Sequence, residues 1–213
     1  MFAVLRDCGA LVKLVPELDR LFGVPQRAEF HPEVDTGIHT LMVVDQSAVF
    51  GYPLPVRWAS LLHDLGNGVP PPQMLPRHHG HEAASVDLAL DVCTRLKVPN
   101  DCRDLALLTA RYHGEIHRAA ELRPNTLVSL FEKTDALRRP DRFRQLLDAC
   151  RCDYTGRLGS ETADYPQATR LEQALAAVQS VDAGALAATL ADKSQIPTRL
   201  HEARVLAVKN LMF

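Results

Sequence analysis

The sequence predicts an all-α protein. Apolar residues recur with the helical period in most segments, no convincing alternation of apolar and polar residues is present, and prolines and glycines divide the chain into helix-sized pieces. With 213 residues, of which 46% are hydrophobic and 23% charged, the chain is long enough to bury a sizeable core. We expect a helical core over residues 1–160 and a helical extension over residues 161–213, packed on or beside the core.

The first half of the chain begins with one or two short helices over residues 2–22, followed by a polar loop over residues 23–36. Apolar residues at helical spacing then predict a helix over about residues 38–49. The next helix begins near Pro53 and is expected to stop at residues 66–68, where glycines can form a C-cap. Residues 69–80, which include His78 and His79, are too rich in proline for regular structure and should form a stiff loop beside an open cleft.

The second half of the chain is predicted to be helical almost throughout. One helix covers about residues 82–96, and another begins at Asn100, a favourable N-cap residue. Further helices are expected from Pro124 to Asp135 and after Pro140, because proline is favoured in the first helical turn. A loop over residues 153–159 then precedes the tail, which is rich in alanine and leucine.

Charge and cysteine content narrow the class of protein. The net charge of −2 provides no overall basic field for nucleic-acid binding. The five cysteines are odd in number and lack a C-x-x-C pair, which favours reduced thiols over a disulfide framework or a zinc finger. The N-terminus carries charges where a signal peptide needs its apolar stretch, and no run approaches the roughly 20 apolar residues of a membrane span. We therefore expect a soluble cytoplasmic protein.

Two adjacent polar residues, His63 and Asp64, lie in an apolar segment that is predicted to be a buried helix. Burying a charged group costs several kcal/mol unless the group is paired or coordinates a metal. His39 and Asp135 occupy similar positions on two other predicted helices. Together the two imidazoles and two carboxylates predict one divalent-metal site, against the alternative that each is a hydrogen-bonded core residue.

Nitrogen and oxygen donors without thiolate suit manganese, iron, cobalt, nickel or zinc better than copper(I) or an iron–sulfur cluster. Four protein ligands leave coordination positions for water and substrate. Such an ion lowers the pKa of bound water and polarises a phosphoryl oxygen, so the site predicts hydrolysis of a phosphate ester.

Three further side chains are candidates for the same chemistry. His81 opens a predicted helix, and His113 borders the apolar stripe of another. Either could bind a phosphate, relay a proton or hold a second metal ion, and with Asp64 they form the expected catalytic set. Arg157 lies between two glycines in a loop and could hold a phosphate bidentately, although an exposed arginine in a turn is equally compatible.

Motifs of other enzyme classes are missing. The sequence contains no G-x-S-x-G, no G-x-G-x-x-G and no P-loop. Serine hydrolases of the nucleophile-elbow type, dinucleotide-binding enzymes and P-loop NTPases are therefore not indicated.

The order of His39, His63-Asp64 and Asp135 resembles the H…HD…D signature of the HD-domain metal-dependent phosphohydrolases. Longer strings look like the C-terminal HD domain of the bacterial multifunctional CCA-adding tRNA nucleotidyltransferases, and they are distributed over nearly the whole chain. These strings are HPEVDTGIH (residues 31–39), HDLG (63–66), PRHHGH (76–81), VPN (98–100), RDLA (103–106) and ADYPQ (163–167).

The resemblance implies an HD-domain helical bundle with a divalent-metal-dependent activity on 2′,3′-cyclic nucleotides, 2′-nucleotides and phosphate esters, and a role in trimming or repairing tRNA 3′ ends. It assigns the metal ligands to His39, His63, Asp64 and Asp135, and it places the additional histidines of related enzymes near His81 and His113. The expected cofactor is nickel, manganese, cobalt or iron, with magnesium as a further candidate.

Two features depart from the family pattern. Position 67 is asparagine where the family often has lysine, which removes a cation from the neighbourhood of the substrate phosphate. No segment resembles the nucleotidyltransferase head, and the chain has no Asp-x-Asp pair. We therefore expect that this polypeptide does not add CCA.

Two other functions stay open at this point. One is a general HD-type nucleotidase that acts on free mononucleotides. The other is a tRNA-binding accessory module with a vestigial metal site, in which cations of the tail contact tRNA phosphates. The tail residues concerned are Arg170, Lys193, Arg199, Arg204 and Lys209. The complete set of candidate ligands favours an enzyme, because a scaffold has no use for four buried polar side chains.

Overall fold

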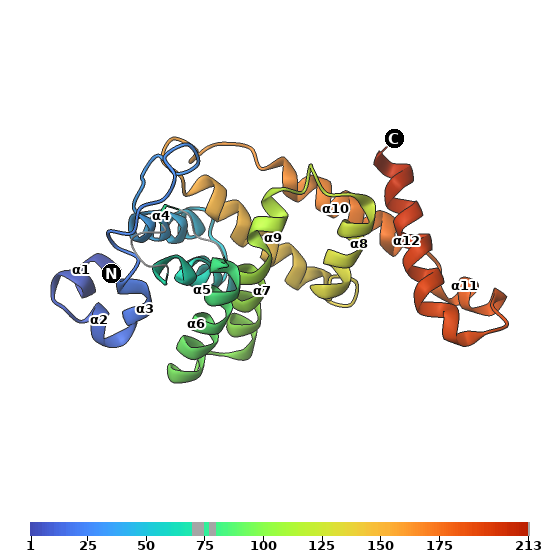
Figure 1. Cartoon of the computed structure of the whole chain (residues 1–213), viewed down its shortest axis with the longest axis horizontal. Helices are drawn as coiled ribbons and strands as arrows, with labels where there is room; N and C mark the ends of the chain where they lie inside the picture. Colours follow the sequence, from blue (N-terminus) through green and yellow to red (C-terminus); the bar gives the residue numbers. More distant parts are fainter. Residues whose placement is uncertain (70–74, 77–79, 213) are drawn as a thin grey trace. The chain divides into compact units, whose positions relative to one another are not determined.

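The computed structural model describes residues 1–69, 75–76 and 80–212, and the regular elements in these ranges are helices (Figure 1). The predicted all-α fold is confirmed. Most of the proline-rich loop, including His78 and His79, lies outside the described residues. All five cysteines are free thiols. Among the helices in the described ranges, none is long and apolar enough to cross a membrane.

The chain divides into two compact units. The first contains Met1–Ile116 and Gln145–Tyr165, and the second contains His117–Arg144 and Pro166–Phe213. The expected core boundary near residue 160 is close to the end of the first unit. The second unit, however, also includes His117–Arg144, a segment that the sequence analysis placed in the core. Helical periodicity is the same in both units, so it does not show where the chain leaves one unit and returns to it.

The first unit begins with three short helices, α1 (Phe2–Asp7), α2 (Leu11–Leu14) and α3 (Pro16–Asp19). Gly9 separates the first two with a positive φ of 71°, a conformation that glycine adopts at little cost. Pro16 occupies the first turn of α3, where its missing N–H is no loss. The segment therefore contains three short helices where the sequence analysis expected one or two.

Helix α4 (Thr36–Val49) begins at a strong N-cap. The Asp35 carboxylate accepts hydrogen bonds from the Ile38 N–H at 2.9 Å and from the Gly23 N–H at 2.6 Å. It thereby satisfies an unpaired donor at the helix start and ties that start to the preceding loop. Gly37 packs directly against Phe22, since a Cβ at this position would lie 2.6 Å from the Phe22 ring. The beginning of α4 is thus fixed from two sides, three residues before His39.

Helix α5 (Leu54–Leu62) ends just before His63 and Asp64, and the chain continues as the 3-10 helix η1 (Leu65–Gly68). Helix α6 (His81–Arg95) packs against η1, and the Gly66 N–H donates to the Ser85 hydroxyl at 2.8 Å. A second contact joins α5 to α6, where the half-buried Trp58 directs its indole N–H toward the Cys93 sulfur at 3.3 Å. These contacts place the first residue of α6, His81, beside the end of α5.

Helices α7 (Asn100–His117) and α9 (Pro140–Thr155) supply the remaining walls of the first unit. The buried face of α7 contains His113 together with apolar and small residues, so this histidine lies within the buried stripe and not at its border. Gly156, one residue after α9, lies against Val43 of α4, where a Cβ would approach Val43 Cγ2 to 2.7 Å. Glycine at this position lets the end of α9 approach α4 closely.

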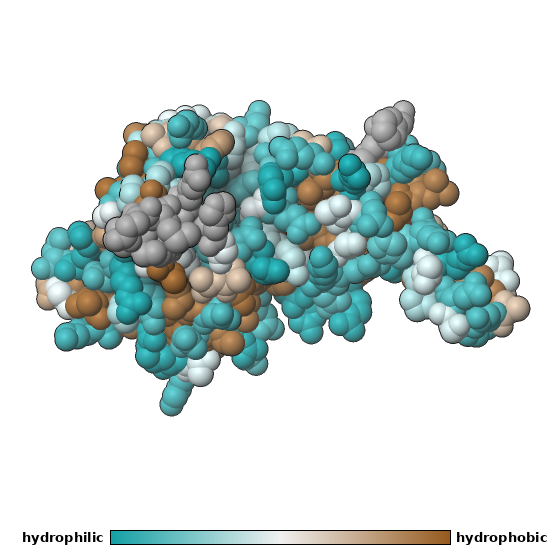
Figure 2. All heavy atoms as spheres, viewed as in Figure 1, coloured by the Kyte–Doolittle hydropathy of each residue, from teal (hydrophilic) through white to brown (hydrophobic). Residues whose placement is uncertain are grey.

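The second unit contains α8 (Pro124–Lys133), α10 (Pro166–Gln179), α11 (Ala183–Thr189), η3 (Lys193–Gln195) and α12 (Ile196–Met212). Phe131 and Phe143 pack edge to face with ring centroids 5.4 Å apart. Helix α12 is held to α8 by polar contacts, in which His201 lies between Glu132 and Asn125 and Arg204 also reaches Glu132. On the face shown in Figure 2, each unit is mostly hydrophilic, with its apolar residues in small separate patches.

The η1–α6 contact leads to a prediction about Gly66. A Cβ added here would overlap the His81 carbonyl oxygen and lie 2.7 Å from the Ser85 backbone nitrogen. Because both neighbours are backbone atoms, Gly66→Ala should displace the start of α6 and lower the free energy of unfolding by about 3 kcal/mol, the upper part of the range for overpacked interiors. Urea unfolding monitored by circular dichroism measures this change.

Gly68→Ala is the matched control in the same 3-10 helix. The nearest neighbours of its Cβ would be Arg20 Cβ and Leu21 Cδ2 at 3.4 Å and the Arg20 carbonyl carbon at 3.7 Å, all ordinary contacts. We expect this variant to unfold within about 1 kcal/mol of the wild type, as a tolerated change of small volume. Equal destabilisation by the two substitutions would show that the α6 contact is not the constraint.

Candidate metal centre

The polar cluster of the first unit forms where α4, the end of α5 and α9 meet. His39 of α4 and Asp153 of α9 are in contact, with 2.9 Å between Nε2 and Oδ1. His63 Nε2 lies 3.7 Å from the same Asp153 oxygen and 3.6 Å from Oδ2 of its neighbour Asp64. The side chains of His39 and His63 are at most 1% exposed, and those of Asp64 and Asp153 at most 7%. Four potential ligands therefore converge in the interior.

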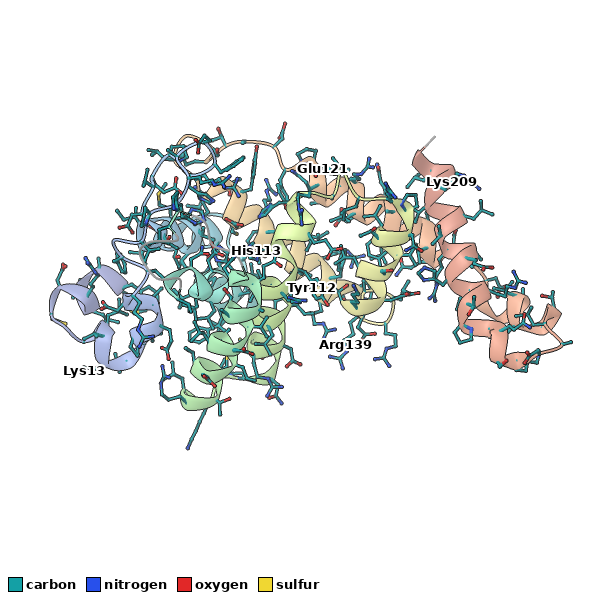
Figure 3. The ribbon with its side chains drawn as sticks, in the orientation of Figure 1. Lys13, Tyr112, His113, Glu121, Arg139 and Lys209 are labelled. Atoms are coloured by element: carbon teal, nitrogen blue, oxygen red, sulfur yellow. The ribbon has the colours of Figure 1, made fainter. Side chains whose placement is uncertain are left out.

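A second group adjoins the first through Asp64. Its Oδ1 lies 3.4 Å from Nε2 of His113 on α7 and 3.8 Å from Nε2 of His81 at the start of α6. The structure thus brings His81, His113 and Asp64 together, as expected for the catalytic set. His113, whose α7 position is labelled in Figure 3, is nearly fully buried, whereas the side chain of His81 is 28% exposed. His81 is the member of this group that solvent can reach.

Backbone contacts define the orientation of two of the rings. His63 Nδ1 lies 2.8 Å from the Ser60 carbonyl oxygen, and His113 Nδ1 lies 2.9 Å from the Thr109 carbonyl oxygen. A carbonyl can only accept a hydrogen bond, so each ring carries a proton on Nδ1 and directs Nε2 into the cluster. This is the arrangement in which a histidine presents a nitrogen to a metal while its other nitrogen is held by the protein.

The pKa values of the ionisable groups shift in different directions within the cluster. Burial lowers the pKa of His63 and keeps its ring neutral. Burial also opposes the charged form of His39 and His113, but the negative charge of the neighbouring carboxylate, Asp153 for His39 and Asp64 for His113, raises the pKa of each to about 9. Burial alone would raise the pKa of Asp64, yet the surrounding histidines hold it well below its usual value. Asp64 is therefore an anion at neutral pH.

Arg157 approaches the first group from the loop after α9. Its guanidinium lies 3.9 Å from Asp153 Oδ1 and 5.4 Å from the Tyr154 ring, and Nε is buried without a hydrogen-bond partner. The side chain is 19% exposed and is therefore not the exposed turn residue that was the alternative reading of the sequence. Asn67 is also buried, and its Oδ1 has no hydrogen-bond partner among the described residues.

Asp135, the fourth expected ligand, belongs to the second unit, and its carboxylate pairs with arginines of that unit. It follows the end of α8 in the second unit with a φ of 58°, in the left-handed region where a helix C-terminus commonly turns. Its carboxylate accepts hydrogen bonds from Arg138 at 2.7 and 3.1 Å and lies 3.8 Å from Arg142. Within the first unit, Asp153 is the carboxylate that contacts His39 and lies beside His63.

Helical spacing could have identified Asp153. Leu146, Cys150 and Asp153 are related by i, i+4 and i+7, so the aspartate continues the buried face of α9. The sequence analysis instead assigned residue 153 to the beginning of a loop, whereas α9 extends to Thr155. The signal that could have identified Asp153 was its place on the apolar stripe of α9. The sequence analysis missed it because it ended that helix too early.

Most cations of the tail have partners within the second unit. Arg170 donates to the Ala119 carbonyl oxygen, and Lys193 to the carbonyl oxygens of Ala187 and Leu190. Arg199 pairs with Glu202, and Arg204 pairs with Glu132. Lys209, the fifth, is exposed on α12 (Figure 3). Four of the five candidate RNA contacts therefore already serve in intramolecular interactions.

His39, His63 and Asp153 offer ligand atoms within 4.8 Å of one another and so fit a divalent cation, and Asp64 lies beside His63. Cis ligands of an octahedral ion at about 2.1 Å are about 3 Å apart, close to the 2.9–3.7 Å separations found here. His63 Nε2 and Asp64 Oδ1 are buried without hydrogen-bond partners, which is costly unless something else binds them. Nitrogen and carboxylate donors are the combination that transition-metal ions prefer.

Comparison with known protein families matches the HD domain to residues 36–155, a range that contains α4, α5, α7, α9 and all the candidate ligands of both groups. The chain belongs to the HD-domain family. Its His/Asp clusters are consistent with a metal-dependent phosphohydrolase. The family resemblance inferred from the sequence motifs is confirmed. No solved structure matches the chain.

Several curated proteins are similar over the whole chain. A multifunctional CCA protein from Dechloromonas aromatica (strain RCB) is 65% identical over 212 residues, which is 100% of this chain and 52% of the relative. The multifunctional CCA protein of Azoarcus sp. (strain BH72) is 58% identical over 211 residues, covering 99% and 51%, respectively. That of Burkholderia multivorans is 58% identical over 213 residues, covering 100% and 52%. The chain spans about half the length of the curated relatives it matches.

The ring orientations can be tested without metal. In the metal-free protein we expect the proton of His63 on Nδ1, because that nitrogen donates to the Ser60 carbonyl while burial disfavours a second proton. Nitrogen-15 NMR of the imidazole rings distinguishes this tautomer. A His63 protonated on Nε2 at neutral pH would contradict the arrangement.

Proposed function

We propose that this chain is a divalent-metal-dependent phosphohydrolase whose metal ligands are His39, His63, Asp64 and Asp153. The observation that carries the proposal is the convergence of these donors from three elements, with His63 Nε2 and Asp64 Oδ1 buried and without hydrogen-bond partners. Membership of the HD-domain family supports the same conclusion. Nickel, manganese, cobalt and iron suit these donors, and magnesium is the hard-ion alternative.

When bound, the metal would act as a Lewis acid that polarises a phosphoryl oxygen and activates water near neutral pH. The chain's own residues supply binding and proton transfer. His81, partly exposed beside Asp64, can donate to a phosphate oxygen or to the leaving group. His113 is held by the Thr109 carbonyl and keeps its Nε2 toward Asp64, which preserves the charge and position of that carboxylate.

Arg157 is proposed as a contact for the substrate phosphate. A guanidinium with a buried, unpartnered Nε beside the cluster offers fixed donors to an oxyanion. This cation could compensate for the lysine that Asn67 replaces. Its attraction to Asp153 is weak at 3.9 Å, so the guanidinium remains available to an anionic ligand.

The proposed substrates are 2′,3′-cyclic nucleotides, 2′-nucleotides and related esters at RNA 3′ ends, with repair or trimming of tRNA ends as the cellular role. The similarity to multifunctional CCA proteins supports a substrate of this kind. Contact with tRNA through the tail is a weaker part of the proposal, because four of its five cations have partners within the chain. Activity confined to free 5′-mononucleotides would favour the general nucleotidase instead.

The choice of Asp153 over Asp135 gives a direct test. Asp153→Asn removes a charged ligand and should weaken divalent-metal binding by more than about 100-fold, beyond the effect usual for an outer-sphere residue, and abolish hydrolysis of 2′,3′-cyclic nucleotides. Asp135→Asn weakens contacts to Arg138, Arg139 and Arg142 in the second unit and should retain both properties. Metal analysis after purification without chelator, with an ester assay, measures both. The opposite pattern would restore Asp135 as the ligand.

The role of His81 predicts a different pattern. His81→Ala should lower the turnover of 2′,3′-cyclic nucleotides by about 100-fold, the lower end for loss of a proton-transfer group, while metal content falls much less. His201→Ala is the control, because this histidine contacts Glu132 and Asn125 in the second unit. Full activity in the presence of EDTA, or unchanged turnover in His81→Ala, would refute this mechanism.

A further inference from the structure

A carboxylate outside the proposed ligand set contacts His39 from the opposite side to the metal centre. Glu33 lies in the turn before α4, and its side chain is only 3% exposed. Its Oε1 is 2.7 Å from His39 Nδ1, while His39 Nε2 is 2.9 Å from Asp153. One ring nitrogen therefore faces the proposed metal position and the other faces Glu33.

The same carboxylate contacts two further groups. Oε2 accepts a hydrogen bond from the Leu158 N–H at 3.2 Å, in the loop that follows α9. Oε1 also lies 3.1 Å from His31 Nδ1, and the His31 ring packs edge to face on His39 with centroids 4.5 Å apart. Glu33 thus joins α4, which carries His39, to the segment that follows Asp153.

The backbone around Glu33 is held in an unfavourable conformation. Val34 has a φ of 61°, which is rare for a β-branched residue, and its side chain is 39% exposed, so burial does not compensate for the strain. Backbone hydrogen bonds close the turn, from the Val34 N–H to the His31 carbonyl at 2.9 Å and from the Gln26 N–H to the Val34 carbonyl at 2.6 Å. The turn places the Glu33 side chain in the interior, and the unfavourable backbone conformation falls on its neighbour Val34.

We propose that Glu33 is a positioning residue of the metal centre, which fixes the tautomer and orientation of His39 and ties that ligand to the segment carrying Asp153. The inference rests on the proposed metal function. A carboxylate that accepts the second N–H of a ligating histidine orients the ring and increases its basicity, and loss of such a partner commonly weakens metal binding by about 10–100-fold. Glu33 has the reach and burial to act in this way.

Titration with Co²⁺ tests the proposal, because its visible spectrum reports the ligand set together with the affinity. Glu33→Ala should weaken Co²⁺ binding by about 10–100-fold and alter the spectrum, since the His39 ring is no longer held. Glu33→Gln keeps an acceptor oxygen for Nδ1–H and should restore most of the affinity. Wild-type affinity and an unchanged spectrum in Glu33→Ala would overturn the proposal.

Glu17→Ala is the matched control. Glu17 is another largely buried glutamate of the first unit, but it pairs with Arg95 at 2.8 Å and contacts none of the proposed ligands. This variant should lose stability and keep the wild-type Co²⁺ affinity. If Glu17→Ala weakens Co²⁺ binding as much as Glu33→Ala does, the effect is one of general stability and the positioning role is refuted.

The two proposals fail in different ways. If the wild-type chain binds no Co²⁺, both proposals, the metal centre and the positioning role of Glu33, are refuted. If the wild type binds Co²⁺ and Glu33→Ala binds it equally well, only the role of Glu33 falls. Should Glu33→Ala not fold, Glu33→Gln decides through nitrogen-15 NMR: the His39 Nδ1 resonance shifts if Glu33 is its partner, and an unchanged resonance overturns the proposal.

Discussion

The carboxylates of Asp64 and Asp153 are buried in the first unit. The helices of this unit must therefore be placed so that both carboxylates have partners. An isolated carboxylate in a protein interior costs several kcal/mol, so each requires cationic or metal partners. Histidines from α4, the end of α5, α6 and α7 surround the two carboxylates. In the metal-free chain, His39 and His113 can offset the two negative charges, because the pKa of each is raised to about 9. A divalent cation would supply the same positive charge as the protonated His39 and His113 together.

Such a cluster requires helix ends to approach more closely than ordinary side chains allow. Gly66 lets η1 lie against the start of α6, and Gly156 lets the end of α9 lie against Val43 of α4. Each glycine is within three residues of a proposed ligand, Asp64 or Asp153. In this fold, small residues determine the backbone separation, and the backbone separation then brings the polar side chains within coordination distance.

The sequence was sufficient where physical signals were local. Helical periodicity and proline positions predicted most of the elements, and the buried pair His63-Asp64 predicted the chemistry of the site. Two features depended on tertiary structure. Asp135 and Asp153 are both acidic residues near predicted helix ends, and only the packing of α9 shows that the second one reaches His39. Glu33 was part of a recognised motif, but its role depends on a turn whose unfavourable Val34 conformation no propensity would predict.

Trp58 is the single tryptophan of the chain, and its indole contacts Cys93 between α5 and α6 in the first unit. Indole fluorescence therefore reports on the packing of that unit alone, since the second unit contains no tryptophan. Circular dichroism, in contrast, averages over the helices of both units. Coincidence of the two signals during denaturation is a criterion of two-state behaviour. One native residue thus makes the cooperativity between the two halves of the fold observable without any introduced label.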